Sequence, residues 1–307
     1  MPPLTLADKL RDRFDGETRA LIFSAAKLAD ERKVRIALVG GAVRDLLLDQ
    51  PLGDADLMLE HPAKPLVTEL AAMLGAELIS HERFFTFSLV LSNAKKIDIV
   101  TAREEVYPGP AKLPMVTPSS IEQDMKRRDF TINAMACWLN RDSLGKILDP
   151  FDGRSDMKRK TLRALYEKSF FDDPTRLFRA ARFAGRLGFG VEPATEDGIV
   201  DSIKAGAPRL LSPVRLRHEF ELILKERNAA PILAILKRWK ALELIHPGWK
   251  AVDPASYQPA PQSALPERLT AWFRPFGEAA ARKMMTDLAF EKHVKVEVLS
   301  KLVQYRR

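Results

Sequence analysis

The hydrophobic pattern of the chain changes twice along its length. Between residues 6 and 33, apolar side chains recur at helical spacing among charged ones, which predicts an amphipathic helical lead-in. Short apolar or alternating segments follow and predict strands, with one helical segment at residues 65–74. After residue 157 strand patterns nearly vanish and helical patterns dominate. The predicted strands are residues 35–39, 77–79, 85–90 and 97–100.

Prolines and turn-forming residues mark the interruptions. Residues 107–118 contain four prolines, which predicts a long loop, and such loops beside a site often carry function. The sequence Asp-Pro-Phe-Asp-Gly at 149–153 predicts a turn and a domain boundary. Residues 251–266 also hold four prolines and predict a loop or linker. The chain therefore reads as an α+β protein, with a mixed-sheet region followed by helical regions.

Composition narrows the class of partner. The 307 residues suffice for more than one domain. The net charge is +8, and residues 154–186 hold ten Lys and Arg against four acids, which suits a polyanionic partner. Cys137 is the sole cysteine, so an intrachain disulfide and a cysteine-based zinc site are excluded. The sequence shows no apolar leader and no run of membrane length, so we expect a cytosolic protein without a membrane partner.

A glycine pair follows the first predicted strand. Gly40 and Gly41 allow a tight turn that brings backbone N–H groups close to a ligand. Residues 42–48 are rich in helix formers, so the start of this segment predicts a phosphate site. Arg44, one turn further on, adds a guanidinium fork for phosphate oxygens.

Three aspartates predict a metal site. Asp54 and Asp56 are two residues apart in a segment that continues as a strand, so their side chains share a face. Asp98 lies inside an apolar strand-like run, where an unpaired charge is costly. Carboxylates on adjacent strands suit Mg²⁺. The alternative is that Asp54 and Asp56 end a loop, while Asp98 caps or pairs with a nearby arginine.

Two further segments carry charged groups in a pattern. Residues 124–136 predict a helix with Arg128, Asp129 and Asn133 on one face, which could hold a ribose or base. Residues 173–186 predict a second helix, capped by Asp173 with Pro174 at its first position. Arg176, Arg179 and Arg182 recur in it at intervals of three, on the side away from its apolar residues. A triphosphate or RNA backbone would stabilise these arginines; the alternative is that they extend into water or pair with Glu196, Asp197 or Glu219.

In content and order these motifs resemble those of class II tRNA nucleotidyltransferases and bacterial poly(A) polymerases. The resemblance covers about residues 34–190, and four motifs in order are more specific than any one of them. The matching segments are 40–45 with 54–56, 127–134, 149–153 with 156–157, and 172–176 continuing to 184.

The resemblance implies a fold and a set of site residues. It implies a polymerase-β-like nucleotidyltransferase head at residues 1–153, a helical neck at 154–225 and a helical body at 226–307. It implies two Mg²⁺ ions on Asp54 and Asp56, and incoming-base selection by Asp173 and Arg176. The other implied nucleotide contacts are Gly41, Arg44, Arg128, Asp129, Arg179 and Arg182.

The implied reaction is attack of the 3′-hydroxyl of a tRNA on the α-phosphorus of CTP or ATP, with pyrophosphate leaving. The strand pattern makes Asp98 the expected third metal ligand and acceptor of the hydroxyl proton. We expect tRNA and nucleoside triphosphates as partners, no DNA, and a monomer or homodimer. The sequence leaves open whether CCA, CC or A is added.

Two departures from the family pattern stand out. Asp172 replaces the glutamate that begins the family's Glu-Asp-x-x-Arg motif, and it is one methylene shorter. Residues after about 230 show no matching signature, which predicts less surface for holding a tRNA.

Three other functions compete. A poly(A) polymerase would share the head motifs, but those enzymes usually carry an arginine-rich strand where this chain has residues 81–87. A small-molecule nucleotidyltransferase would not need the basic segment after residue 154. The last is a non-catalytic RNA-binding protein, which intact Asp54 and Asp56 disfavour.

Overall fold

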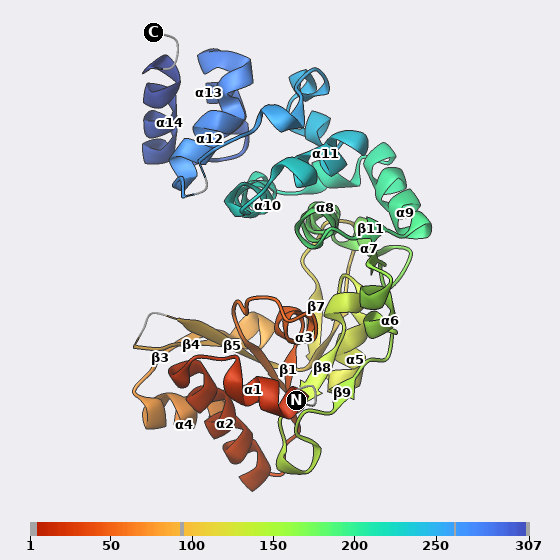
Figure 1. Ribbon diagram of the computed structural model, residues 1–307, viewed down its shortest axis with the longest axis vertical. Helices are drawn as coiled ribbons and strands as arrows, with labels where there is room; N and C mark the ends of the chain where they lie inside the picture. The colour runs from red at the N-terminus through yellow and green to blue at the C-terminus, as the bar shows by residue number, and fades with distance from the viewer. Residues whose placement is uncertain (1–4, 93–94, 261, 305–307) are drawn as a thin grey trace. The chain divides into compact units, whose positions relative to one another are not determined.

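A computed structural model describes residues 5–92, 95–260 and 262–304, which form two compact units. The first unit comprises residues up to 108, 114–159 and 163–165, and the second comprises 109–113, 160–162 and 166 onward. The α+β architecture expected from the sequence is confirmed, because the strands of the large sheet all lie in the first unit and the second is mainly helical (Figure 1). The predicted domain boundaries after residues 153 and 225 stay predictions.

A seven-stranded mixed sheet forms the centre of the first unit, in the order β3-β4-β5-β2-β1-β8-β9. The central strand β2 (Asp56–Leu59) pairs antiparallel with β1 (Ile36–Val39) and parallel with β5 (Lys96–Thr101). The remaining strands are β3 (Glu77–His81), β4 (Thr86–Val90), β8 (Ala136–Trp138) and β9 (Ile147–Leu148).

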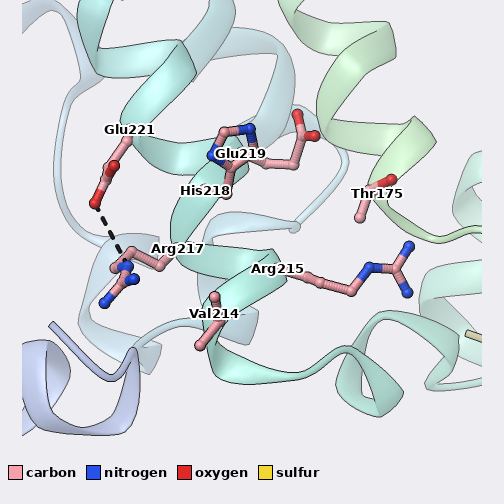
Figure 2. A pocket seen from close by; sticks show the side chains of 7 residues that line it. All are labelled: Thr175, Val214, Arg215, Arg217, His218, Glu219 and Glu221. Atoms are coloured by element: carbon pink, nitrogen blue, oxygen red, sulfur yellow. Dashed lines mark ion pairs between the residues drawn. The ribbon is translucent and has the colours of Figure 1, made fainter. Parts of the chain in front are cut away.

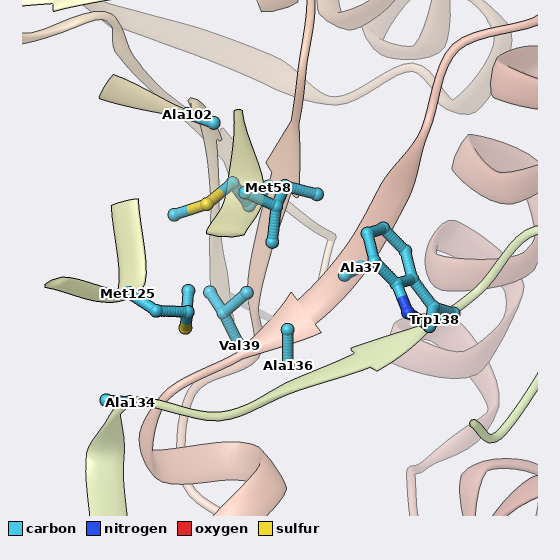
Figure 3. Packing of buried hydrophobic residues seen from close by; sticks show 9 residues of the cluster. Ala37, Val39, Met58, Ala102, Met125, Ala134, Ala136 and Trp138 are labelled. Carbon is cyan, nitrogen blue, oxygen red and sulfur yellow. The ribbon is translucent and has the colours of Figure 1, made fainter. Parts of the chain in front are cut away.

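Helices cover both faces of this sheet, which is why its central strands are apolar on both sides. On one face α2 (Gly16–Glu31) packs against α4 (Ala63–Leu74), which contacts β3, β4 and β5 (Figure 1). On the other face α5 (Ile121–Lys126) contributes Met125 to an apolar cluster with Val39 and Met58 (Figure 3). Since Asp56 lies two residues before Met58, it shares the face of this cluster.

The predicted helical lead-in is two helices. The first is α1 (Leu6–Asp12), and α2 begins after Asp15, whose side chain accepts a hydrogen bond from the backbone N–H of Thr18. This N-cap interrupts the helical pattern that the apolar spacing alone had joined.

The prediction of one long loop at 107–118 is wrong in its last part. Residues Met115–Pro118 form β7, which pairs antiparallel with β6 (Arg103–Val106). Proline is tolerated there because Pro118 stands at the end of a two-stranded ribbon.

The prediction of a helix at 124–136 is wrong as well. Helix α5 ends at Lys126, a short 3₁₀ turn follows at Thr131–Asn133, and β8 begins at Ala136. Contacts distant in sequence override the helical pattern: the Thr131 N–H bonds the carbonyl of Arg163, and Phe130 forms a bridge with Ala164. Cys137 and Trp138 lie in the core, on strand β8.

The second unit consists of helices with one short parallel strand pair, β10 (Thr161–Leu162) and β11 (Gly190–Val191). Its first helices are α7 (Ser169–Asp172), α8 (Thr175–Leu187), α9 (Pro193–Lys204) and α10 (Pro213–Lys225). Later helices are α11 (Ala230–Arg238), α12 (Leu265–Phe273), α13 (Gly277–Asp287) and α14 (Lys292–Gln304). Among the described residues, no helix combines the length and apolar character needed to cross a membrane.

Candidate active site

The predicted metal ligands lie on or next to two neighbouring interior strands of the sheet, β2 and β5. The Cα atoms of Asp56 and Asp98 are register partners on the parallel strands β2 and β5, and Asp56 also faces Val39 at the end of β1. Asp54 is exposed in the turn just before β2. The expectation that Asp98 lies on a strand adjacent to Asp56 is therefore confirmed.

The electrostatics of this site centre on Asp56. The pKa of its carboxyl is raised to about 6: burial and then the negative charges of Asp98 and Asp54 raise it, whereas Arg128 and Lys96 oppose the rise. A half-buried carboxylate beside two others favours either a proton or a nearby cation. This donor set of hard oxygens fits a divalent metal ion such as Mg²⁺.

Within the protein itself Asp98 already has partners. It accepts a hydrogen bond of 2.6 Å from the Ser88 hydroxyl on β4, and it lies 3.1 Å from the ammonium of Lys96. Across the described residues, no three acidic, histidine or cysteine side chains converge closely enough to hold a metal ion. The role of Asp98 as third ligand stays a prediction.

Steric restrictions explain why glycine occupies positions 40 and 41 in the turn after β1. Gly40 has φ +71° and ψ −131°, a conformation that favours glycine, and a Cβ there would lie 2.8 Å from Nη1 of Arg128. The predicted helical segment at 42–48 is α3 (Gly41–Leu47), which begins one residue earlier at Gly41, where a Cβ would lie 3.4 Å from Nη2 of Arg44. The turn therefore passes two guanidinium groups at close range.

Arg44 is more buried than we expect for a guanidinium group that binds phosphate oxygens. Its side chain is almost fully buried: Nε and Nη2 donate to the carboxylate of Asp45 at 2.8 and 3.0 Å, and Nη1 donates to Oδ1 of Asn133. Asn133 in turn donates to Asp129 at 3.0 Å. The predicted proximity of Asp129 and Asn133 is thus confirmed, but in a turn rather than on a helix face.

Arg128 connects this network to the carboxylates. Its Nη1 donates to the carbonyl of Asn133 at 3.3 Å, and its Nε lies 3.4 Å from the buried Asp124. Burial lowers the pKa of Arg128, whereas the charges of Asp124 and Asp56 raise it. The side chain is therefore a half-buried positive charge close to Asp56.

A second group of predicted residues lies at the start of α8 in the second unit. The helix begins at Thr175, and the side chain of Asp173 serves that start by accepting from the N–H and hydroxyl of Thr175 at 3.1 and 2.7 Å. The predicted cap is thus displaced by one residue, with Pro174 as N-cap. The same Asp173 oxygen, Oδ1, lies 2.7 Å from Nη2 of Arg215 on α10.

The three arginines of α8 do not form the single outward row that their spacing predicts. Arg176 is 5% exposed, and its Nη1 donates to the Tyr166 hydroxyl and Ser169 hydroxyl. Arg179 and Arg182 lie near the ring of Phe183, and Arg182 is 3.8 Å from Glu226. Packing against aromatic rings draws these side chains inward.

The sequence did not predict the contacts of Tyr166 with Arg176 and of Arg215 with Asp173. Arg215 also donates from Nη1 to the carbonyl of Ala111 at 3.0 Å, which brings residues of the 107–114 loop to α10. No local signal predicts these contacts, because Arg215 is 42 residues from Asp173.

The sequence of the chain is similar to those of known proteins. The family described as the Poly A polymerase head domain matches residues 36–163. An A-adding tRNA nucleotidyltransferase of Geobacter sulfurreducens is 39% identical over 232 residues, which are 75% of this chain and 26% of that protein. A CC-adding tRNA nucleotidyltransferase of Deinococcus radiodurans is 33% identical over 246 residues, which are 76% of this chain and 64% of that protein.

Solved structures extend the likeness to both units. A CCA-adding enzyme in an apo form is 31% identical with a TM-score of 0.79, and the match covers 96% of this chain and 73% of that one. The chain belongs to the class II tRNA nucleotidyltransferase family. CCA-adding enzymes of this family, solved in complex with tRNA and with CTP, match at 28% identity and a TM-score of 0.76 each, and the matches cover 96% and 98% of this chain and 72% and 73% of theirs.

As a family member the chain is short. It spans about a quarter of the Geobacter nucleotidyltransferase and just under two thirds of the Deinococcus one. Membership in this family accounts for the presence in one chain of the aspartates of β2 and β5, the turn at Gly40 and Gly41, and the charged residues at the start of α8.

Proposed function

We propose that this chain transfers nucleotides to the 3′ end of tRNA without a nucleic-acid template, adding C, A or both from CTP and ATP. The observation that most supports the proposal is the pairing of Asp56 with Asp98 on neighbouring strands, where the pKa of Asp56 is raised to about 6. Carboxylates whose charge is disfavoured by burial and by one another suit a site for a divalent metal that carries a triphosphate.

In the first unit, Asp54 and Asp56 would hold two Mg²⁺ ions, with Asp98 as third ligand. Bound Mg²⁺ would lower the pKa of the attacking hydroxyl and neutralise charge on the triphosphate. We assign the phosphates and sugar to Gly41, Arg44 and Arg128, and Asn133, which donates to Asp129, lies beside Arg44. In the second unit, we assign base selection to Asp173 and Arg176, and further nucleotide contacts to Arg179 and Arg182. These assignments rest on the family resemblance.

The reaction is a single displacement. The oxygen of the RNA 3′-hydroxyl forms a bond to the α-phosphorus, the bond from that phosphorus to the bridging oxygen breaks, and pyrophosphate leaves with the electron pair. Asp98 accepts the hydroxyl proton. Arg128, half-buried close to Asp56, stabilises the negative charge on the oxygens of the phosphoryl group.

The test uses tRNA ending at the discriminator base, at C or at CC, with CTP and ATP supplied separately. Extension of any of these acceptors by one or two defined nucleotides supports the proposal, and the pattern tells CCA, CC and A addition apart. Long adenylate runs on every acceptor would instead indicate a poly(A) polymerase. Absence of extension on all three would refute the proposal.

A further inference from the structure

Buried polar atoms without a hydrogen-bond partner occur in both units among the described residues. In the second unit one of them is Oε2 of Glu219, a residue that lines a pocket of about 350 Å³ (Figure 2). The positive charges of Arg179 and Arg182 oppose the rise that burial causes in the pKa of Glu219. In the first unit two such atoms, Oδ1 of Asp124 and Nε of Arg128, lie 3.4 Å apart. These two are an acceptor and a donor that already lie close together, so each can satisfy the other.

The two carboxylate oxygens of Asp124, on α5, have different surroundings. Asp124 is fully buried, and its Oδ2 accepts from the backbone N–H of Arg103 at 3.0 Å. The same oxygen accepts from Nε and Nη2 of Arg127 at 3.0 and 2.8 Å. Oδ1 accepts no hydrogen bond from the described residues. The three bonds to Oδ2 fix the orientation of the carboxylate, so Oδ1 is held next to Arg128.

Arg128 extends from this carboxylate to the glycine turn. Its Nε is buried beside Asp124, whereas its Nη1 donates to the carbonyl of Asn133 at 3.3 Å. Nη1 also lies against Gly40, where a Cβ would come within 2.8 Å of it. Because 16% of the surface of the Arg128 side chain is exposed, a ligand at the turn can meet the guanidinium while Asp124 holds its buried end.

The distance between Oδ1 and Nε suits a hydrogen bond that forms on ligand binding. Leaving a buried donor and a buried acceptor unsatisfied costs free energy, and a bond between a guanidinium and a carboxylate is among the stronger hydrogen bonds. Hydrogen bonds in the active sites of ligand-free enzymes are often long or poorly aligned, and they tighten when the substrate binds. A small rotation of the Arg128 guanidinium would bring its Nε–H into line with Oδ1 of Asp124.

We propose that Asp124 is a positioning residue for Arg128: nucleotide bound at the turn of Gly40 and Gly41 orients the guanidinium, and the hydrogen bond from Nε to Oδ1 then forms. The inference rests on the proposed function, because it takes Arg128 as a nucleotide contact. Asp124 acts through Arg128 and does not touch the nucleotide. By holding the buried end of the guanidinium it keeps the other end directed at the ligand.

The test is a double-mutant cycle on equilibrium binding of CTP and of ATP to the full chain, with Mg²⁺ and without tRNA. In Asp124→Asn the three donors at Oδ2 should bind the amide oxygen, so that the amide NH₂ opposes the Nε–H of Arg128. Affinity for both nucleotides should therefore fall at least about tenfold. In an Arg128→Met background the same change should alter affinity by less than about twofold, because the group that Asp124 positions is gone.

Glu105→Gln is the matched control. The Glu105 side chain is nearly buried and shares two partners with Asp124, since its Oε1 lies 3.1 Å from Arg103 and 2.8 Å from Arg127. Among the described residues the contacts of Glu105 do not include Arg128. Nucleotide affinity of this variant should stay within about twofold of the wild type.

The Nε–H resonance of Arg128 gives a second readout, which does not require Asp124→Asn to fold. The wild-type chain is labelled with ¹⁵N-arginine, and Arg128→Lys identifies the resonance by its loss. Saturating CTP or ATP should move the resonance downfield and slow the exchange of its proton with solvent, because the N–H enters a charge-assisted hydrogen bond.

Additive losses from Asp124→Asn and Arg128→Met would overturn the inference, because Asp124 would then act independently of Arg128. A loss in Glu105→Gln equal to that in Asp124→Asn would overturn it too, since it would indicate that Asp124 only anchors Arg103 and Arg127. An Nε–H resonance that neither nucleotide changes would have the same consequence. Because binding is measured without tRNA, failure of the proposed function, seen as absent tRNA extension, is a separate result.

Discussion

The most specific prediction concerns Asp56→Asn, which should stabilise the first unit and abolish its chemistry. The pKa of Asp56 is raised from 3.8 to about 6 in the fold, chiefly by burial and by the charge of Asp98. Between these values the folded state binds a proton more tightly than the unfolded state. Wild-type stability therefore falls as pH rises through this window.

The size of the effect follows from that shift. Two pKa units correspond to about 3 kcal/mol of unfolding free energy. Asparagine does not titrate, so the variant should match the wild type below pH 4 and exceed it by up to about 3 kcal/mol at pH 8 without metal.

Hydrogen exchange of peptides covering β1 and β2, followed in urea with EDTA, reports the stability of the first unit separately from the second. Adding Mg²⁺ should then stabilise the wild type and not the variant, because only the wild type retains the carboxylate. Exposed Asp201→Asn on α9 is the matched control. Equal stability of wild type and Asp56→Asn at pH 8, or equal stabilisation of both by Mg²⁺, would refute the reasoning.

Three further predictions test other parts of the account. Arg176→Ala should blur the choice between CTP and ATP in the tRNA assay, and unchanged base choice would remove Arg176 from base selection. Gly40→Ala should cost about 2 kcal/mol of stability, measured by urea unfolding, because of its positive φ and the half-buried Arg128 guanidinium; a neutral effect would contradict the steric argument. Asp156→Ala should cost about 3–5 kcal/mol, because this fully buried acid binds Thr131 at 2.6 Å and lies 2.9 Å from Arg163; a change below about 1 kcal/mol would show that its ion pairs are not needed.

The sequence predicts the strands that carry Asp56 and Asp98 for a physical reason. Residues 35–39 and 97–100 are apolar runs that can only be buried strands, and acids inside or beside them stand out because burial of charge is costly. Parallel pairing of β2 with β5 then brings Asp56 and Asp98 together. The apolar pattern was sufficient to find these strands because the cost of burying a charge depends on the residues beside it.

Prediction fails where distant contacts decide the backbone. Residues 124–136 have a helical pattern, yet the bond from Thr131 to Arg163 and the bridge from Phe130 to Ala164 pull the chain into a turn and a strand. The salt bridge between Arg215 and Asp173 is equally invisible in the sequence, because α10 meets the start of α8 only after folding.

The measurement that most directly tests the central claim is a single-turnover rate of nucleotide addition to tRNA by the wild type, Asp54→Asn and Asp56→Asn, with tRNA binding measured in parallel. The account predicts that both variants lose addition by at least about a thousandfold, since loss of one preorganised charge-stabilising group commonly costs that much, and that both bind tRNA as the wild type does. Addition by either variant within about tenfold of the wild-type rate would contradict the assignment of these carboxylates as the metal-binding centre.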